Sequence, residues 1–262
     1  MLQRFFRIIR KLLWVFGLAP DHLWLNIRSI GWFIKDYFKF QKSDKEKAFP
    51  FKIPYPVFSE RFAESGRIGG HYFHQDLLVA NKIFNAKPNK HVDVGSRTDG
   101  FVAHVASFRE IEVVDIRKAD VNIRNIKFIE ADFMVPNPEW EEYTDSISSL
   151  HVIEHFGLGR YNDPIDPAGY LKGLDNIYSM LKKGGKFYFS TPIGPQRINF
   201  NAHRVFSMNY LKELLLGRYM LDSFSYIDDS GDLHENADVN SKEAGLNFNC
   251  TFGCGVFELT KK

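Results

Sequence analysis

The sequence of 262 residues lacks the features that mark several classes of protein. Its two cysteines, Cys250 and Cys254, are too few for a disulfide framework and indicate a reducing compartment. No run of about 18 uncharged apolar residues is present, so we do not predict a membrane span. The formal net charge of +2 indicates no polyanionic partner, and we do not expect nucleic-acid binding. These absences favour a cytoplasmic protein.

The overall composition is that of an ordinary globular protein. Apolar residues make up 44% of the chain and charged residues 25%, which is enough for a sizeable core. A chain of this length suits one main domain with an extension. The two cysteines are spaced to lie on one face of a strand, and we interpret them as small core residues. We predict no metal site, and the sequence shows no internal repeat or low-complexity tract.

The N-terminal segment carries most of the positive charge. Residues 1–47 contain ten Lys or Arg and four Asp or Glu, so their balance is +6 and that of the remaining chain is about −4. Basic and apolar side chains recur here with helical spacing, which predicts an amphipathic basic helix. They are Arg4, Phe5, Arg7, Ile8, Ile9, Lys11, Leu12 and Leu13. A second helix is predicted from Asp21, a candidate N-cap, to Phe40.

Two uses of this basic extension are open. Helices of this kind lie on anionic membrane surfaces without spanning them, so we predict peripheral membrane contact through residues 1–45. Packing of the apolar face on the protein's own domain is the alternative. A secretory signal is not expected, because the apolar run "LLWVFGLA" is short and no clear A-x-A site follows it. Residues 48–69, partly charged and partly proline-rich, are interpreted as a linker.

From residue 70 to residue 262, apolar runs typical of strands alternate with helical patterns. The expected strands are 90–96, 111–116, 126–133, 145–153, 186–192, 220–229 and 252–261, and the expected helices are 71–84, 101–108, 167–181 and 207–218. Such alternation indicates a parallel sheet, whereas the last two strands have no convincing helix between them. We predict an α/β fold with a doubly wound, mostly parallel, seven-stranded sheet and an N-terminal helical extension.

Acidic side chains stand at the ends of the first three predicted strands, where doubly wound sheets bind their ligands. The relevant residues are Asp93, Gly95 and Gly100 at the first strand, Asp115 at the second, and Asp132 and Phe133 at the third. A glycine lets the backbone approach a ligand closely. The second-strand acid can accept both hydroxyls of a ribose, and the third-strand acid can accept from an adenine amino group. The pattern favours a nucleoside ligand.

These segments resemble those of class I S-adenosylmethionine-dependent methyltransferases. The resemblance covers about residues 70–262 and rests on "HVDVGSRTDG", "EVVDIR", "IEADF", "DSISSLHVIEH" and "LKKGGKFYFSTP", in the expected order. The closing strand pair also resembles the antiparallel seventh strand of that fold. Within the superfamily, "GHYFHQDLLVA", "HVDVGSRTDGF" and "HVIEHFGLGRYNDPIDP" are similar to a subgroup known only as a domain of unknown function. The resemblance implies a Rossmann-like fold and S-adenosyl-L-methionine as cofactor.

The resemblance also implies roles for single residues. Asp93 and Gly95 match the loop that holds the methionine end of the cofactor. Asp115 matches the ribose-binding acid, and Asp132 matches the adenine-contacting position, with an aromatic residue beside the ring.

Arg97 departs from the family's pattern, which usually has a glycine there. Gly100 restores part of the flexibility, one residue later than the usual third glycine. A guanidinium on this loop could pair with the cofactor carboxylate, or it could fill the space in which the cofactor lies. We expect the first, because the acids at Asp115 and Asp132 are both present, and we count Arg97 and Gly100 among the cofactor-binding residues.

The end of the fourth strand is where the resemblance implies the methyl group and the acceptor. Leu150 and His151 match this position. A hydroxyl acceptor needs a nearby base, and His151 is the first candidate because the pKa of a histidine can lie near 7. His155 and His203 are the next candidates. We expect in-line methyl transfer to an oxygen or nitrogen of a small molecule, catalysed mainly by positioning. A sugar or glycolipid intermediate is one candidate acceptor.

Other interpretations use the same residues. Asp115 also fits an NAD-binding fold, but "GSRTDG" lacks the close glycine spacing that a pyrophosphate needs. The pentad "HVIEH" matches the inverted zinc-protease motif, which requires a long helix, whereas turn-rich "FGLGRYNDP" follows it here. Asp163 and Asp166 could hold a cation or an acceptor, but acids beside prolines favour turns. A non-catalytic Rossmann-like scaffold at a membrane surface is the alternative function, and the sequence leaves the oligomeric state open.

Overall fold

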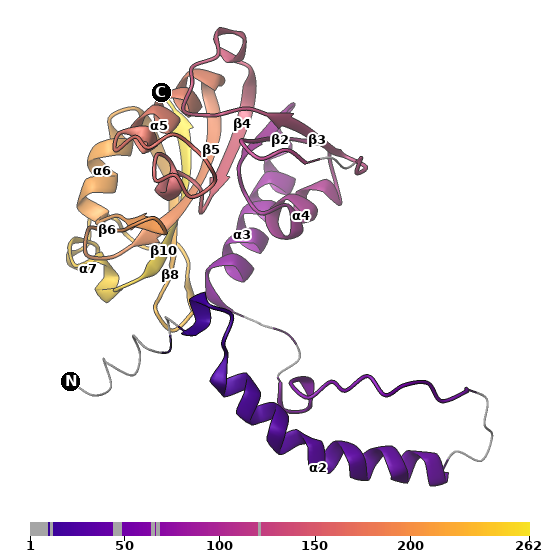
Figure 1. Ribbon diagram of the computed structural model, residues 1–262. Coiled ribbons are helices and arrows are strands. Elements are labelled where there is room, and N and C mark those ends of the chain that lie inside the picture. Colours follow the sequence, from indigo (N-terminus) through magenta and orange to yellow (C-terminus); the bar gives the residue numbers. More distant parts are fainter. Residues whose placement is uncertain (1–9, 11–12, 44–48, 64–65, 67–68, 120–121) are drawn as a thin grey trace. The chain divides into compact units, whose positions relative to one another are not determined.

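The computed structural model of the chain describes residues 10, 13–43, 49–63, 66, 69–119 and 122–262 (Figure 1). The chain divides into two compact units, Met1–Arg67 and Ile68–Lys262. Most of the predicted basic helix, including Arg4, Arg7 and Lys11, lies outside the described residues.

The N-terminal unit is built on α2, Pro20–Ser43. The helix begins at Pro20, a residue type favoured at the first helical position, so the predicted N-cap at Asp21 lies one residue inside it. Aromatic side chains of the returning segment pack against it edge to face, with Phe58 on Trp32 and Phe51 on Tyr37. This segment, which includes the short turn η1 (Glu60–Phe62), therefore packs on α2 rather than forming only a spacer.

The second unit contains one large sheet. Its strands are β1 (His91–Val94), β2 (Ile111–Asp115), β3 (Ile126–Glu130), β4 (Thr144–Leu150), β5 (Leu181–Ile193), β8 (Tyr219–Ile227), β9 (Leu233–His234) and β10 (Gly253–Lys261). They lie in the order β3-β2-β1-β4-β5-β10-β8-β9. The five strands β1 to β5 are parallel, and β10 is antiparallel to both of its neighbours. The carboxyl ends of β1, β2, β3 and β4 thus share one edge.

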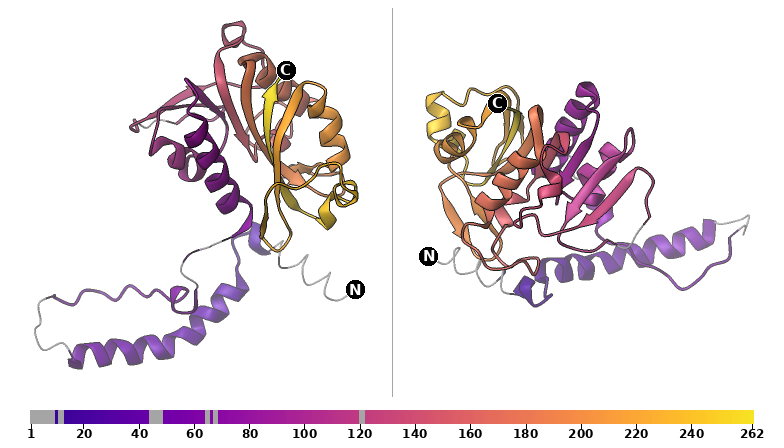
Figure 2. Two further views of the ribbon diagram at one scale, coloured as in Figure 1. Left: turned by 180° about the vertical axis from the view of Figure 1, so that it is seen from behind. Right: turned by 90° about the horizontal axis from the view of Figure 1, so that it is seen from above.

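Helices cover both faces of this sheet (Figures 1 and 2). They are α3 (Gly70–Ala86), the π-turn η2 (Thr98–Val102) and α4 (Ala103–Ala106) on one face, and α5 (Gly169–Met180) and α6 (Met208–Leu216) on the other. Two buried clusters match these faces. Val79 and Ile83 of α3 join Val113 in one, and Ile177 of α5 joins Phe187 in the other. Burial on both faces accounts for the continuous apolar runs of the central strands.

The predicted doubly wound, mostly parallel α/β fold is confirmed, and β10 is the expected antiparallel strand at the end of the chain. The sheet has eight strands instead of the predicted seven, because the two-residue strand β9 pairs with β8. Short elements were not predicted. They are β6 (Arg197–Asn199), β7 (His203–Val205), α7 (Lys242–Gly245) and the turns η3 (Pro138–Trp140), η4 (Ile153–His155) and η5 (Asn247–Asn249). Elements of three or four residues contain too few positions for a periodic pattern. Among the described residues, no helix is both long and apolar enough to cross a membrane.

Candidate functional site

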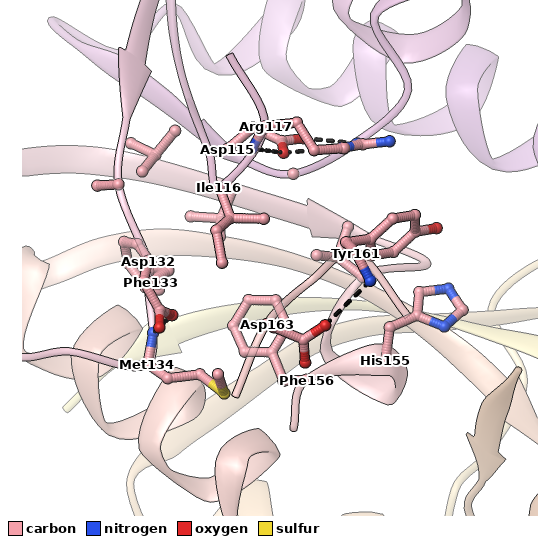
Figure 3. Close-up of a pocket in the computed structure, with 15 residues that line it drawn as sticks. Asp115, Ile116, Arg117, Asp132, Phe133, Met134, His155, Phe156, Tyr161 and Asp163 are labelled. Atoms are coloured by element: carbon pink, nitrogen blue, oxygen red, sulfur yellow. Dashed lines mark hydrogen bonds and ion pairs between the residues drawn. The ribbon is translucent and has the colours of Figure 1, made fainter. Parts of the chain in front are cut away.

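A pocket opens at the shared carboxyl edge of the parallel strands (Figure 3). Residues 94–95, 114–117 and 131–134 line it, from the ends of β1, β2 and β3. Val152, His155, Phe156, Tyr161 and Asp163, which follow β4, complete the lining. The cavity measures about 50 Å³, which is room for a few water molecules only.

Asp115 lies in the pocket and is already paired. Its carboxylate accepts hydrogen bonds from the backbone N–H of Arg117 at 2.8 Å and from the guanidinium at 2.9 and 2.6 Å. The guanidinium also stacks over the ring of Tyr161, with Cζ 4.5 Å from the centroid. Arg117, which the sequence analysis did not single out, therefore already occupies both carboxylate oxygens of Asp115 (Figure 3).

The end of β3 forms an apolar wall with one acidic group. Asp132 lines the pocket and accepts from the backbone N–H of Met134 at 2.9 Å, so one carboxylate oxygen is engaged in a turn. Phe133 is buried, stacks on Trp140 at 5.6 Å, and is fixed by a bond from Asn176 to its carbonyl. This arrangement can cover a flat ring while presenting an acceptor at its edge.

Asp93 does not line the pocket, but its hydrogen bonds fix the loop that does. The carboxylate is fully buried and accepts from the backbone and hydroxyl of Ser96 at 2.9 and 2.7 Å, and from Ser148 at 2.6 Å. The Ser96 hydroxyl in turn accepts from the N–H of Leu150 at 3.0 Å. Burial raises the pKa of Asp93 to about 6, against the hydrogen bonds that favour the anion. Between Asp93 and Ser96 lies Gly95, whose φ of +70° requires glycine and whose added Cβ would lie 2.7 Å from Val152.

The unusual Arg97 points away from the pocket. Its guanidinium pairs with Asp99 on the same loop at 2.7 Å and lies over Tyr72. Gly100 permits close packing of α3, because an added Cβ would lie 2.6 Å from the buried carboxylate of Asp76. Burial raises the pKa of Asp76 to about 6. In this structure neither Arg97 nor Gly100 lines the pocket.

The loop after β4 is organised by a carboxylate and a guanidinium. Asp163 accepts from the backbone N–H groups of Gly157, Gly159 and Tyr161 at 2.9, 3.2 and 3.0 Å. Arg204 donates from β7 to the carbonyls of residues 154, 156 and 167. Asp166 accepts from the N–H of residue 168 and pairs with Lys172. Asp163 and Asp166 therefore have the turn-forming contacts expected of acids beside prolines.

His151 is deeply buried in the turn after β4 and is strained. Its φ of +56° lies in the left-handed region, which is uncommon for a residue with a side chain. Its Nδ1 donates to Glu154 Oε1 at 2.7 Å, and its ring lies parallel to that of His71 with 5.2 Å between centroids. Burial lowers the pKa of His151, but Cys254 and Glu154 outweigh burial and hold it well above its ordinary value.

The other two candidate histidines are tied to loops. His155 lines the pocket, with its Nδ1 2.6 Å from the carbonyl of Ala202. Burial lowers its pKa. His203 lies against Phe252 and its Nε2 is 3.0 Å from Asn199. The pentad "HVIEH" forms the three-residue turn η4 instead of the long helix that the zinc-protease motif requires.

The pocket thus brings together Gly95, Asp115, Asp132, Phe133 and His155 of the predicted residues. Asp93 and Leu150 support it from behind, and His151 and His203 lie outside its lining. The sequence analysis missed the lining residues Arg117, Met134 and Tyr161. Arg117 stands two residues beyond Asp115, so its side chain returns to the same side of the extended chain.

Comparison with known families identifies the chain. A family model described as "Caenorhabditis protein of unknown function, DUF268" matches residues 101–251, more than half of the sequence. The chain belongs to the DUF268 family. The match begins immediately after the loop of residues 91–100, and it bears out the predicted membership of a subgroup with no assigned activity. Among curated proteins, no sequence matches this DUF268 member.

Solved structures similar to this DUF268 chain include two enzymes with S-adenosylhomocysteine bound. One is 1,6-didemethyltoxoflavin-N1-methyltransferase of Burkholderia thailandensis, at 19% identity and TM-score 0.49, covering 71% of this chain and 78% of that one. Another is the N-methyltransferase NodS of Bradyrhizobium japonicum, at 12% identity and TM-score 0.49, covering 73% and 88%. The [4+2]-cyclase SpnF matches at 13% identity and TM-score 0.49, covering 71% and 81%. The fold assignment rests on the strand order described above.

The buried Asp93 gives this DUF268 protein a measurable pH dependence. Its folded pKa of about 6 lies above the value of 3.8 in the unfolded chain, so the folded state binds more protons between these pH values. Stability conferred by Asp93 should therefore fall as pH rises from about 4 to about 6. In urea titrations, the free energy of unfolding of wild type should fall by about 1 to 3 kcal/mol relative to that of Asp93→Asn over this pH range.

Asp145 provides a control of opposite sign. Burial raises its pKa, but backbone hydrogen bonds from Lys90 and Asn89 outweigh burial and lower it overall. Wild type should therefore gain stability relative to Asp145→Asn as pH rises through the acid range. Parallel stability curves for wild type and Asp93→Asn would contradict the role given to Asp93.

Gly157 should be irreplaceable in the loop that closes the pocket. Its φ is +74°, and an added Cβ would lie 1.8 Å from the carbonyl oxygen of Asp166. Gly184 is the matched control, with φ of +75° and nothing within 4 Å of an added Cβ. Gly184→Ala should cost about 1 to 2 kcal/mol of unfolding free energy. Gly157→Ala should lower the free energy of unfolding by at least about 2 kcal/mol more than Gly184→Ala does. Equal losses in urea titrations would refute the predicted clash with Asp166.

Proposed function

We propose that this protein binds S-adenosyl-L-methionine and transfers its methyl group to an oxygen or nitrogen of a small-molecule acceptor. The observation that carries the proposal is the convergence of Asp115, Asp132 and the Gly95 turn on one pocket at the switch edge of a doubly wound sheet. The cofactor supplies an electrophilic methyl group on a sulfonium.

The donor and acceptor set fits a nucleoside. The Asp115 carboxylate, 14% exposed, can accept two ribose hydroxyls once it is released from Arg117. Ile116 and Phe133 offer apolar surface to either side of a purine. Asp132 keeps one oxygen available to an amino group, because the other accepts from Met134. The positive φ of Gly95 leaves its backbone open to close approach.

Binding requires the pocket to open. A cavity of about 50 Å³ cannot hold a nucleoside, and Arg117 and Tyr161 are the side chains that fill the space. We infer that the ligand displaces the guanidinium from Asp115, so that Arg117 competes with the ligand for this carboxylate.

Methyl transfer then depends on orientation, since in-line attack needs the acceptor held opposite the leaving sulfur. Leu150 ends β4 and His151 follows it, at the position where the resemblance implies the acceptor. His155 ends the turn η4, and His203 begins β7. For a hydroxyl acceptor, His155 is the proposed base, because it lines the pocket and burial lowers its pKa, which keeps its imidazole neutral. The raised pKa of His151 keeps a proton on that ring, which disfavours it as the base. A sugar or glycolipid intermediate is the acceptor we propose to screen first.

The cofactor proposal can be tested by calorimetric titration with S-adenosylmethionine and S-adenosylhomocysteine. Asp115→Ala removes two hydrogen bonds to the ribose and should weaken binding by roughly one to two orders of magnitude. Arg117→Ala should tighten binding several-fold, because the ribose no longer competes with the guanidinium. Asp175→Asn, on the outer helix α5, is the matched acid control and should bind as wild type does.

Two outcomes would contradict the proposal. Wild type and Arg117→Ala could both fail to bind at millimolar concentration, in which case the scaffold alternative gains support. Equal affinities for wild type and Asp115→Ala would mean that any binding observed occurs elsewhere. The variant Arg97→Gly tests the loop separately. A loss of affinity for S-adenosylmethionine in this variant would show that Arg97 leaves Asp99 and pairs with the ligand carboxylate.

A second proposed function concerns the N-terminal unit, which we infer lies on an anionic membrane surface. Leu23, Ile27, Ile30, Ile34 and Phe38 recur at helical spacing on α2 and are each at least 47% exposed. Other side chains of their own unit thus leave this apolar stripe uncovered, and basic side chains flank it.

Flotation with anionic liposomes tests this second proposal. The full chain should float, whereas a chain lacking residues 1–45 should not. Replacement of Leu23, Ile27 and Ile34 by Ser in the full chain should reduce flotation at least several-fold, because the apolar contact is lost while the charge is kept. Equal flotation of all three proteins, or flotation of none, would contradict the membrane proposal.

A further inference from the structure

Three side chains of the metal-binding types meet at the sheet edge beside the pocket. His71 comes from the first turn of α3, His151 from the turn after β4, and Cys254 from β10. One ligand atom from each lies within 4.8 Å of the others. None of the three lines the pocket at Asp115, so the cluster is a separate feature of the fold.

His151 is oriented as metal-binding histidines are. Its Nδ1 donates to Glu154 Oε1 at 2.7 Å, which leaves Nε2 as the atom that faces the cluster. That Nε2 is buried and has no hydrogen-bond partner among the described residues. The His151 side chain is only 5% exposed, so water does not readily satisfy the orphaned nitrogen. A carboxylate on one ring nitrogen and a metal on the other is the usual arrangement in metal sites.

The other two ligands are similarly prepared. The His71 ring lies between two other rings, parallel to that of His151 and tilted against that of Phe252 with 5.5 Å between centroids, and these contacts hold it at the cluster. Cys254 is completely buried, and its thiol makes only long contacts, to Gln75 Oε1 at 3.7 Å and to the next carbonyl at 3.8 Å. Cys254 can therefore turn toward a shared ion without breaking a strong hydrogen bond of its Sγ.

We propose that His71, His151 and Cys254 bind one zinc ion, with the fourth position open to a further ligand. A thiolate with imidazoles selects zinc over magnesium or calcium, which prefer oxygen ligands. Tetrahedral zinc places such ligand atoms about 3.3 to 3.6 Å apart, so the side chains must converge by about 1 Å. The ion would balance the buried Glu154 carboxylate and the Cys254 thiolate, leaving the site without net charge.

His71, which is only partly buried, connects the cluster with the surface. His71 also lines a cavity of about 420 Å³, together with Phe252 and the turn that contains Asp228 and Asp229. A water molecule, or an oxygen or sulfur atom of a ligand in this cavity, can complete the coordination. Because neither the cofactor nor the acceptor enters this argument, the inference stands apart from the proposed function.

Titration of the metal-free full chain with Co²⁺ tests the site, because cobalt reports its own ligands. One equivalent should give intense visible bands of tetrahedral cobalt and a near-ultraviolet thiolate-to-metal band, and Zn²⁺ should displace both. Cys254→Ser should abolish the thiolate band. His71→Gln and His151→Gln should weaken metal binding by at least about 100-fold, and Glu154→Gln by about 10- to 100-fold.

Cys250→Ser and His203→Gln are matched controls, since each removes a cysteine or histidine near the cluster but outside it. Both should keep the wild-type spectrum and affinity. The site is overturned if wild type binds no stoichiometric Co²⁺, or if the thiolate band survives in Cys254→Ser or disappears in Cys250→Ser. The titration of wild type shows whether the metal site exists even if a variant fails to fold. Circular dichroism identifies a variant that does not fold.

Discussion

The buried carboxylate of Asp93 is the constraint on which the carboxyl edge of the parallel strands depends. A carboxylate without water must be fully hydrogen-bonded, and here the partners come from the loop after β1 and from the neighbouring strand β4. The Ser96 hydroxyl continues the chain of bonds to Leu150. A single group therefore fixes the turn at Gly95, the end of β1 and the end of β4 relative to one another.

This frame presents two different environments at one edge of the sheet. Toward β2 and β3 lies the pocket with Asp115 and Asp132, whose present shape is set by Arg117 and Tyr161. Toward β10 lies the cluster of imidazoles and a thiol, which is supported by Glu154. The turn between Leu150 and His155 separates them, and its strained conformation at His151 is held by contacts on both sides. A substitution in this turn should therefore alter both the pocket at Asp115 and the cluster at Cys254.

The loop after β4 illustrates how an acidic residue can be mistaken for a ligand. Asp163 lines the pocket, but its oxygens are occupied by three backbone N–H groups of its own loop. Asp115 is the opposite case, since its partner is a flexible guanidinium that a ligand can displace. The difference lies in the partner: backbone bonds persist while the loop keeps its fold, whereas a side chain can rotate away.

The sequence by itself determined the longer strands and helices of the second unit and their α/β arrangement, because strand and helix periodicities are local properties. It also located Asp115 and Asp132, since acids at strand ends in a doubly wound sheet must share one edge. Only the tertiary structure could decide that Arg117 closes on Asp115, that Arg97 pairs with Asp99, and that Asp93 faces inward. Rotamers and pairings of this kind depend on what surrounds each side chain. The meeting of His71, His151 and Cys254 likewise has no local signature, because three distant segments become neighbours only when β10 enters the sheet beside β5.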